Sequence, residues 1–207
     1  ETEVAFQLED FDNSDVDIDS VTPPQPATPL MQKQFPKSTV IVIQPEFNSV
    51  SPLSLGIQTC KLIQASSWNL TPAGLALLEQ VRSSETTEQV VVIFDGLGST
   101  QPFSNSKQHI LKLCEILGQK LVLIHFRISK TLASCESWIN SVPSYVAISG
   151  YSKVITTEIL ALEVLFFNFF LLQSHPMQEA FLKTLELVPQ LGDTYGFRFF
   201  CQKKTGR

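Results

Sequence analysis

Residues 89–126 read QVVVIFDGLGSTQPFSNSKQHILKLCEILGQKLVLIHF, and this stretch decides the fold class. Its two ends, Gln89–Phe94 and Lys120–Phe126, are short, uninterrupted runs of β-branched and aliphatic residues, which is the pattern of strands buried on both faces. Between them, Ser106–Leu117 repeats its apolar residues every three or four positions, as the buried side of a helix does, and Gly118 is placed to end that helix. The stretch therefore predicts a strand–helix–strand unit with parallel strands.

The same alternation of strand and helix continues on both sides of this unit. A helix is predicted to begin at Pro72, because a proline suits the first turn, and to bury Leu75, Leu78 and Val81. The other strands are predicted at Thr39–Gln44, Cys60–Ala65, Val164–Phe169 and Tyr195–Gln202, and the other helices at Val146–Leu162 and Met177–Leu187. The predicted fold class is therefore α/β, a truncated Rossmann-like fold with a mostly parallel, doubly wound sheet.

The first 36 residues differ from the rest of the chain. Thr2–Leu8 alternates well enough to predict an opening strand, whereas residues 10–29 are first acidic and then proline-rich, a composition typical of a linker. Charge is also unevenly placed, since residues 1–19 contain eight acids and no base, and the last ten residues contain four bases and no acid. We expect an opening strand and linker over 1–36, followed over 37–207 by one structural domain that ends in the closing strand.

The composition is that of a folded domain with few charges. The 207 residues are 43% hydrophobic and only 17% charged, and they include 15 Phe. Such a domain either covers part of its apolar surface with a neighbour or has an unusually large core. The net charge of −5 argues against nucleic acid as a partner, because phosphates require clustered Lys and Arg.

The cysteines and the most apolar segment point to a reduced protein without a membrane span. Cys60, Cys114, Cys135 and Cys201 lie far apart, with no CxxC pair and no His at metal-ligand spacing. This spacing argues against a disulfide framework and a zinc site, and it predicts a cytoplasmic location. Ile159–Leu172 is too short and too often interrupted by polar residues to cross a bilayer, which needs about 20 apolar residues.

Parallel sheets bind ligands where their strands end, so those positions are the candidate site. After Thr39–Gln44 the chain reads Pro45-Glu-Phe-Asn48, without the glycines that let backbone amides approach a pyrophosphate, which argues against NAD or NADP. After Gln89–Phe94 it reads Asp95-Gly-Leu-Gly-Ser99. This stretch is either a phosphate-binding loop or, as we favour, a turn at the sheet edge. Asp95 is then a residue that caps the turn rather than a general base.

Tyrosines and histidines are the remaining candidates for acid–base chemistry. A short-chain reductase requires a Tyr followed four residues later by a Lys, and none of Tyr145, Tyr151 and Tyr195 meets that requirement. His125 lies inside a predicted buried strand, where a hydrogen-bonded structural histidine is the favoured interpretation. The alternative is a catalytic pair of His125 with Cys135, which depends on the fold bringing the two together.

One longer stretch resembles a known family. Pro143-Ser-Tyr-Val-Ala-Ile-Ser-Gly-Tyr-Ser-Lys-Val-Ile-Thr-Thr-Glu158, with the apolar Leu162–Phe169 after it, is similar to the signature of the structural subdomain of polyketide synthase ketoreductases, where a helix precedes a strand. The matching residues are Gly150, Tyr151, Ser152, Lys153 and Glu158. The resemblance covers residues 85–205 and departs from the family at Ile159, where a proline is expected.

The resemblance implies a structural domain or pseudo-ketoreductase that binds no NADPH. Such a domain packs through an apolar face against a catalytic reductase, methyltransferase or enoylreductase domain of the same polypeptide. It implies that the chain by itself is not an enzyme and has no catalytic, cofactor-binding or metal-binding residues of its own. Neither nucleic acid nor a membrane is expected as a partner.

Two alternatives remain open. An inactive caspase-like (CHAT-type) protease domain has a similar succession of buried strands and helices. Such an enzyme needs a His after one strand and a Cys after the next, but these strand ends read Gly96-Leu-Gly98 and His125-Phe-Arg127, so the domain would be inactive. The other alternative is a generic α/β interaction scaffold.

Overall fold

The computed structural model describes residues 37–43, 61–65, 71–97, 107–132 and 139–201. The chain divides into two units, Glu1–Gln34 and Phe35–Arg207, and every described residue belongs to the second. The opening strand predicted at Thr2–Leu8 and the linker predicted at 10–29 lie outside the described residues.

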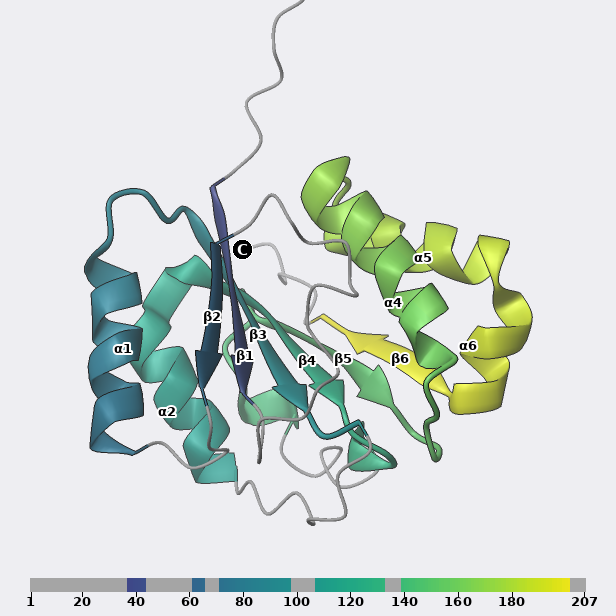
Figure 1. Ribbon diagram of the computed structural model, residues 1–207, viewed down its shortest axis with the longest axis horizontal. Helices are drawn as coiled ribbons and strands as arrows, with labels where there is room; N and C mark the ends of the chain where they lie inside the picture. The colour runs from purple at the N-terminus through teal and green to yellow at the C-terminus, as the bar shows by residue number, and fades with distance from the viewer. Residues whose placement is uncertain (1–36, 44–60, 66–70, 98–106, 133–138, 202–207) are drawn as a thin grey trace, which may run out of the picture. The chain divides into compact units, whose positions relative to one another are not determined.

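Six strands form one sheet in the order β2-β1-β3-β4-β5-β6 (Figure 1). They are β1 Ser38–Ile43, β2 Lys61–Ala65, β3 Gln89–Asp95, β4 Leu121–Arg127, β5 Ala147–Tyr151 and β6 Phe197–Phe200. Neighbouring strands are parallel except for β5 and β6, which are antiparallel. The prediction of a mostly parallel α/β sheet is therefore confirmed, and β2 and β6 are the outermost of the described strands.

Helices cover both faces of this sheet (Figure 1). On one face lie α1 Pro72–Ser83 and α2 Lys107–Leu117, and on the other lie α4 Ile159–Phe167, α5 Met177–Leu187 and α6 Pro189–Tyr195. As predicted, α1 begins at Pro72, and the Thr71 hydroxyl caps it by accepting from the Gly74 amide at 3.2 Å. Gly118 follows α2 with φ +55°, a left-handed conformation that glycine adopts without strain.

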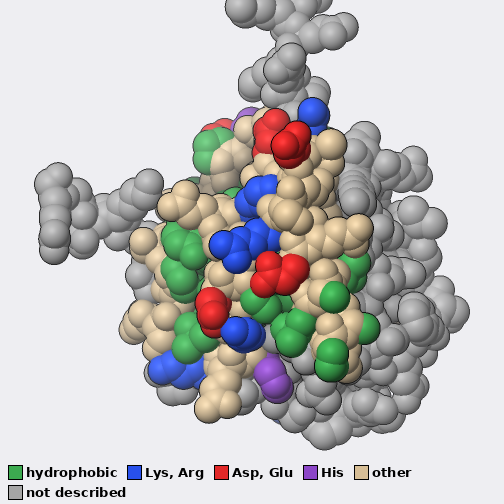
Figure 2. Space-filling view, turned by 90° about the vertical axis from the view of Figure 1, so that its left-hand side faces the viewer, with side chains coloured by type: hydrophobic (Ala, Val, Ile, Leu, Met, Phe, Trp, Pro, Cys, Tyr) green, Lys and Arg blue, Asp and Glu red, His purple; other side chains and the backbone are tan. Residues whose placement is uncertain are grey.

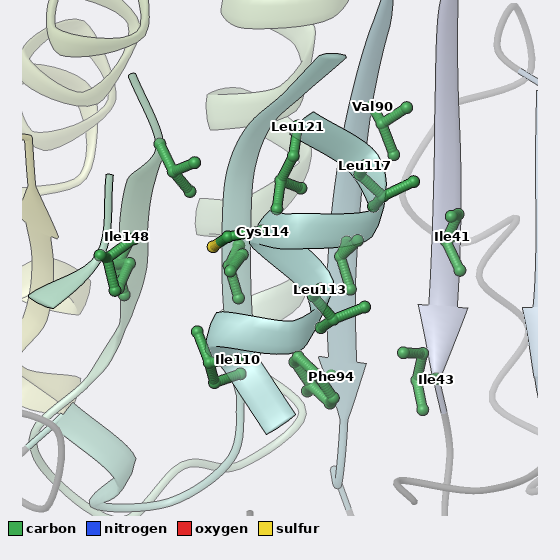
Figure 3. Close-up of a cluster of buried hydrophobic side chains, with 14 of the residues drawn as sticks. Ile41, Ile43, Val90, Phe94, Ile110, Leu113, Cys114, Leu117, Leu121 and Ile148 are labelled. Atoms are coloured by element: carbon green, nitrogen blue, oxygen red, sulfur yellow. The ribbon is translucent and has the colours of Figure 1, made fainter. Parts of the chain in front are cut away.

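The sheet face under α1 and α2 carries a cluster of apolar side chains (Figure 3). Ile110, Leu113 and Leu117 of α2 are buried and belong to one cluster with Phe94 of β3 and Phe126 of β4. The rings of Phe94 and Phe126 stack with centroids 5.3 Å apart. Hydrophobic burial accounts for the packing of this face, as the helical period of Ser106–Leu117 predicted.

The outer surface of α1 and α2 carries acids and bases side by side (Figure 2). Lys112 donates to Glu115 at 3.0 Å, and Arg82 lies 4.0 Å from Glu79. These four side chains, with the apolar Leu75 and Ile116, line an open groove of about 520 Å³ between the helices. Exposed pairs of this kind contribute little to stability and leave no patch of one sign here.

The segment from residue 146 to 172 is where the predicted elements are wrong. The helix predicted at Val146–Leu162 is instead strand β5 followed by a loop and the start of α4. The strand predicted at Val164–Phe169 is instead α4, which continues as a π-helix (η4) over Asn168–Leu172. An apolar run without a period fits a buried helix as well as a buried strand, and Ile159–Leu172 is longer than the usual four to eight residues of a strand, so its length favours the helix.

The close packing of β5 against β4 explains why β5 contains a glycine, Gly150. A Cβ built on Gly150 would lie 2.9 Å from the carbonyl oxygen of Phe126 on β4, so no side chain fits there.

The C-terminal elements also differ from the prediction. Helix α6 was not predicted, and the closing strand begins at Phe197 rather than at Tyr195. Among the described residues, none of the helices is long and apolar enough to cross a membrane.

Candidate functional site

The carboxyl ends of β3, β4 and β5 lie at the same end of the sheet, which is where parallel sheets bind ligands. Each strand ends there on a polar residue: Asp95 on β3, Arg127 on β4 and Tyr151 on β5. Asp95 and Arg127 are paired in the register of β3 and β4, and the Gly96 amide donates to the carbonyl oxygen of Arg127 at 3.0 Å. The backbone therefore holds these strand ends side by side.

Arg127 connects two buried carboxylates. Its Nη1 donates to Oδ2 of Asp95 at 3.1 Å, and its Nε donates to Oε2 of Glu163 at 2.8 Å. Glu163 belongs to α4, the helix that packs on this face of the sheet. The side chains of Arg127 and Glu163 are fully buried, and that of Asp95 is 3% exposed. The one guanidinium is thus paired with both carboxylates inside the protein.

The second carboxylate oxygen of Glu163 accepts two more hydrogen bonds. His125 Nε2 lies 2.8 Å from it and the Tyr151 hydroxyl 3.0 Å from it, and His125 Nδ1 lies 2.8 Å from Oγ of Ser149. Because a carboxylate only accepts, Nε2 of His125 carries a proton. We call this buried set the Glu163 network; its members are Asp95, His125, Arg127, Ser149, Tyr151 and Glu163.

The electrostatics of the Glu163 network fix its charged groups in place. Burial alone would raise the pKa of Glu163, but the charge of Arg127 and the hydrogen bonds from His125 and Tyr151 outweigh it, so this pKa lies below its usual value. Burial and the neighbouring carboxylate together raise the pKa of Tyr151 well above its usual value. Glu163 is therefore an anion and Tyr151 a neutral donor at neutral pH.

Nη2 of Arg127 is the exception to the otherwise satisfied network. It is buried and has no hydrogen-bond partner in the described part of the chain. Its Nε and Nη1, by contrast, each bind a carboxylate. The guanidinium is thus held from one side, and its remaining donors are left unused among these residues.

Ser149, His125 and Glu163 have the connectivity of a nucleophile, a base and an acid. The hydroxyl and the carboxylate bind opposite nitrogens of one imidazole, both at 2.8 Å. All three residues have zero exposure, however, and Ser149 lies in the middle of β5. A substrate carbonyl cannot approach within bonding distance of a buried hydroxyl, so this arrangement is structural in the folded domain.

The structure places the other candidate residues as follows. Both ring nitrogens of His125 are hydrogen-bonded, as the structural interpretation predicted. The alternative pair with Cys135 stays untested, because Cys135 lies outside the described residues. Asp95 caps the turn that follows β3, because its Oδ1 accepts from the Leu97 amide at 3.2 Å. The prediction that Asp95 caps a turn is therefore confirmed, but its ion pair with Arg127 was not predicted.

The remaining two tyrosines lie apart from the network. Tyr145 is 38% exposed. The Tyr195 hydroxyl is hydrogen-bonded to Thr156 and to Glu158, and so ties the loop after β5 to α6. Lys153, in the same loop, donates to the carbonyl oxygen of Asp193 at 2.7 Å. These contacts fix the loop and place no Lys beside a Tyr hydroxyl in the described residues.

Glu163 is the residue of the site that sequence reasoning missed. In the sequence it is one of the polar residues that interrupt the apolar run Ile159–Leu172. The available signal was the charge itself, since a carboxylate within a buried segment must have a cationic or hydrogen-bonding partner. Arg127 at the end of a buried strand gives the same signal, and together they predict a pair.

Comparison with known proteins adds one finding. No protein-family profile matches the sequence, and no curated protein matches it. Among solved structures, the caspase drICE is similar, with a TM-score of 0.54 and 8% sequence identity over 80% of this chain and 87% of that chain. The domain has a caspase-like fold. At this level of identity the likeness concerns the fold alone.

The resemblance to the structural subdomain of polyketide synthase ketoreductases is therefore wrong. A solved structure that the chain resembles is a caspase, and the residues of the ketoreductase motif form other secondary structure than that family requires. Where the resemblance requires a helix after Pro143 the chain forms β5, and where it requires a strand over Leu162–Phe169 the chain forms α4. The implied synthase partners lose their basis with it.

Proposed function

We propose that this domain is a catalytically inactive member of the caspase-like fold, which acts by binding and not by cleaving peptides. One observation carries the proposal. Asp95 and Arg127, which end the two strands after which a caspase-like enzyme needs a His and then a Cys, are buried and paired with each other.

The chemistry of these two side chains supports the proposal. Peptide hydrolysis requires a nucleophile with a base in reach and with access to the substrate carbonyl. A guanidinium stays protonated and has no lone pair to offer, and the Asp95 carboxylate is occupied by Arg127 and by the Leu97 amide. Arg127 can therefore neither attack a substrate nor act as a base, and Asp95 could act as a base only if its ion pair with Arg127 broke.

The ion pair also suggests what the strand ends do in place of catalysis. Arg127 joins β3 to α4 through two charge-assisted hydrogen bonds, so it fixes the carboxyl ends of these strands instead of reacting there. Strand ends fixed in this way would hold the loops that follow them in a constant arrangement for a binding partner. The scaffold alternative and the inactive protease alternative therefore converge on one role.

The test is an activity measurement on the full chain, residues 1–207. It is incubated with a mixed peptide library and, separately, with a peptidyl fluoromethyl ketone for reactive thiols and a fluorophosphonate for reactive hydroxyls. We expect no cleavage above buffer and no adduct on Cys135 or Ser149 by mass spectrometry. Cleavage that disappears in Cys135→Ala or Ser149→Ala would overturn the proposal.

A matched control separates catalysis from incidental reactivity. Cys201 has an exposed thiol, so it can react with the fluoromethyl ketone without any catalytic assistance. Cys201→Ala removes that background while leaving the strand ends unchanged. If a residue is labelled at the same rate in the native and the denatured protein, the labelling is incidental. If labelling is faster in the folded protein, catalytic assistance is present and the proposal is contradicted.

A further inference from the structure

Helix α4 has two neighbouring faces that are both built of large apolar residues. They are Ile159, Leu162 and Phe166 on the first face and Leu160, Val164 and Phe167 on the second. The first face is fully buried, whereas Leu160 and Val164 are only partly buried. The two faces differ in size by about one methylene group, so hydrophobic burial hardly distinguishes the observed helix from one turned by about 100°, the angle between successive residues.

Helix capping gives no further selection of the side that faces the sheet. Glu158 stands at the N-cap of α4, but its side chain makes no capping hydrogen bond, and the other end of α4 continues into the π-helix η4. Helix α2 on the opposite face is different, because it has exposed polar residues, among them Lys112 and Glu115, beside a buried apolar side. An amphipathic helix of that kind has one favoured setting on a sheet.

Glu163 is the one polar residue of α4, and its partners on the sheet are specific. Its carboxylate accepts from Arg127 Nε at 2.8 Å, from His125 Nε2 at 2.8 Å and from the Tyr151 hydroxyl at 3.0 Å. These donors belong to β4 and β5, so two strands hold the carboxylate at once. If α4 turned by one residue, Glu163 and Arg127 would lose each other inside the protein, which costs far more than exchanging one apolar side chain for another.

We propose that the Glu163 network selects the rotational setting of α4 on the sheet, and that it contributes uniqueness of packing rather than net stability. Burying charges costs solvation, so replacing a buried ion pair with apolar residues of similar size often leaves stability unchanged or raises it. The same charges strongly disfavour every arrangement in which they lose one another. Hydrophobic burial thus holds α4 on the sheet, and the Glu163 network determines which side of α4 faces it.

The test replaces the whole network with uncharged residues of similar size in the full chain, residues 1–207. The changes that make this neutral variant are Asp95→Asn, His125→Leu, Arg127→Met, Ser149→Ala, Tyr151→Phe and Glu163→Leu. Either Leu162→Cys or Val164→Cys is then added to the native chain and to the neutral variant. The rate at which each new thiol reacts with a maleimide is measured by peptide mass spectrometry, which separates it from the other cysteines.

The expected result is a loss of the difference between the two positions. In the native chain Leu162→Cys should react at least about tenfold more slowly than Val164→Cys, because Leu162 has zero exposure and its thiol would react only after a local opening. In the neutral variant we expect cooperative unfolding at an undiminished urea midpoint. The two rates should then lie within about threefold of each other, because α4 adopts more than one setting.

Helix α2 supplies the matched control, since Leu113 is buried and Lys112 is exposed. The ratio of rates for Leu113→Cys and Lys112→Cys should be the same in the native chain and in the neutral variant, and a fall on α2 as well would contradict a role confined to α4. An unchanged ratio on α4 in the folded neutral variant would show that apolar packing alone selects the setting. Failure of the neutral variant to fold would overturn the proposal too, because the network would then be required for stability. The inference does not depend on the proposed function.

Discussion

Both faces of the sheet bury an apolar cluster, but among the described residues only the face under α4 also buries charged side chains. Along β4, Ile124 and Phe126 turn to the apolar cluster under α2, whereas His125 and Arg127 turn to Glu163 on α4. On the first face, hydrophobic burial is sufficient. On the second, the core contains charges that are stable only as a set. The side of β4 that faces α2 can be predicted from the pattern of apolar residues in the sequence. The side that faces α4 can be understood only once the partners of its charged residues are known.

The largest effect is expected from breaking the charged face. Arg127→Met removes the cation but keeps the length of the side chain, so it leaves the carboxylates of Asp95 and Glu163 buried without compensation. We expect the free energy of unfolding to fall by about 3–5 kcal/mol, measured by urea denaturation at neutral pH. Lys112→Met is the matched control on the exposed Lys112–Glu115 pair and should cost less than about 1 kcal/mol.

Acid should reduce the difference between the native protein and Arg127→Met. The pKa of Glu163 is lowered in the folded protein, so its ionised form stabilises the fold at neutral pH. That contribution is fully present above the usual carboxylate pKa and is lost as the pH falls through the lowered value. Urea midpoints measured from pH 7 downward should converge, and a gap that widens in acid would contradict the assignment.

On the apolar face, the comparable change is a cavity. Leu113→Ala removes a fully buried side chain from the cluster under α2 and should cost about 2–5 kcal/mol. No titratable group of the Glu163 network lies on this face, so the loss should be the same at pH 7 and at pH 5. Leu113→Met, which keeps the volume, should cost less than about 1.5 kcal/mol and so separates packing from side-chain identity.

The smallest of the three effects isolates one hydrogen bond to Glu163. Tyr151→Phe keeps the ring and removes only the hydroxyl that donates to the carboxylate at 3.0 Å. A hydrogen bond to a charged group predicts a loss of about 1.5–3 kcal/mol in urea denaturation. Tyr145→Phe, at an exposed position, should stay within about 0.5 kcal/mol. Equal effects of the two variants would mean that Tyr151 contributes by packing alone.

Much of the fold could be predicted because its signals are local. The strands Gln89–Phe94 and Lys120–Phe126 and the helix between them follow from residues that are neighbours in the sequence. The failure at 146–172 has the opposite cause. One side of α4 is buried, but its other side carries the partly buried apolar residues Leu160, Val164 and Leu165. The sequence of Ile159–Leu172 therefore shows no polar face, and without one it has no helical period to detect.

The sequence by itself determined the α/β class and the mostly parallel sheet, because alternating buried runs and amphipathic helices leave few other arrangements. Only the tertiary structure decided the Glu163 network. Arg127 and Glu163 are 36 positions apart, and Asp95 is 32 positions before Arg127. No periodicity relates such distant residues. A charged residue in a buried segment indicates that it has a partner. Only the packing of α4 against the sheet determines which residue that partner is.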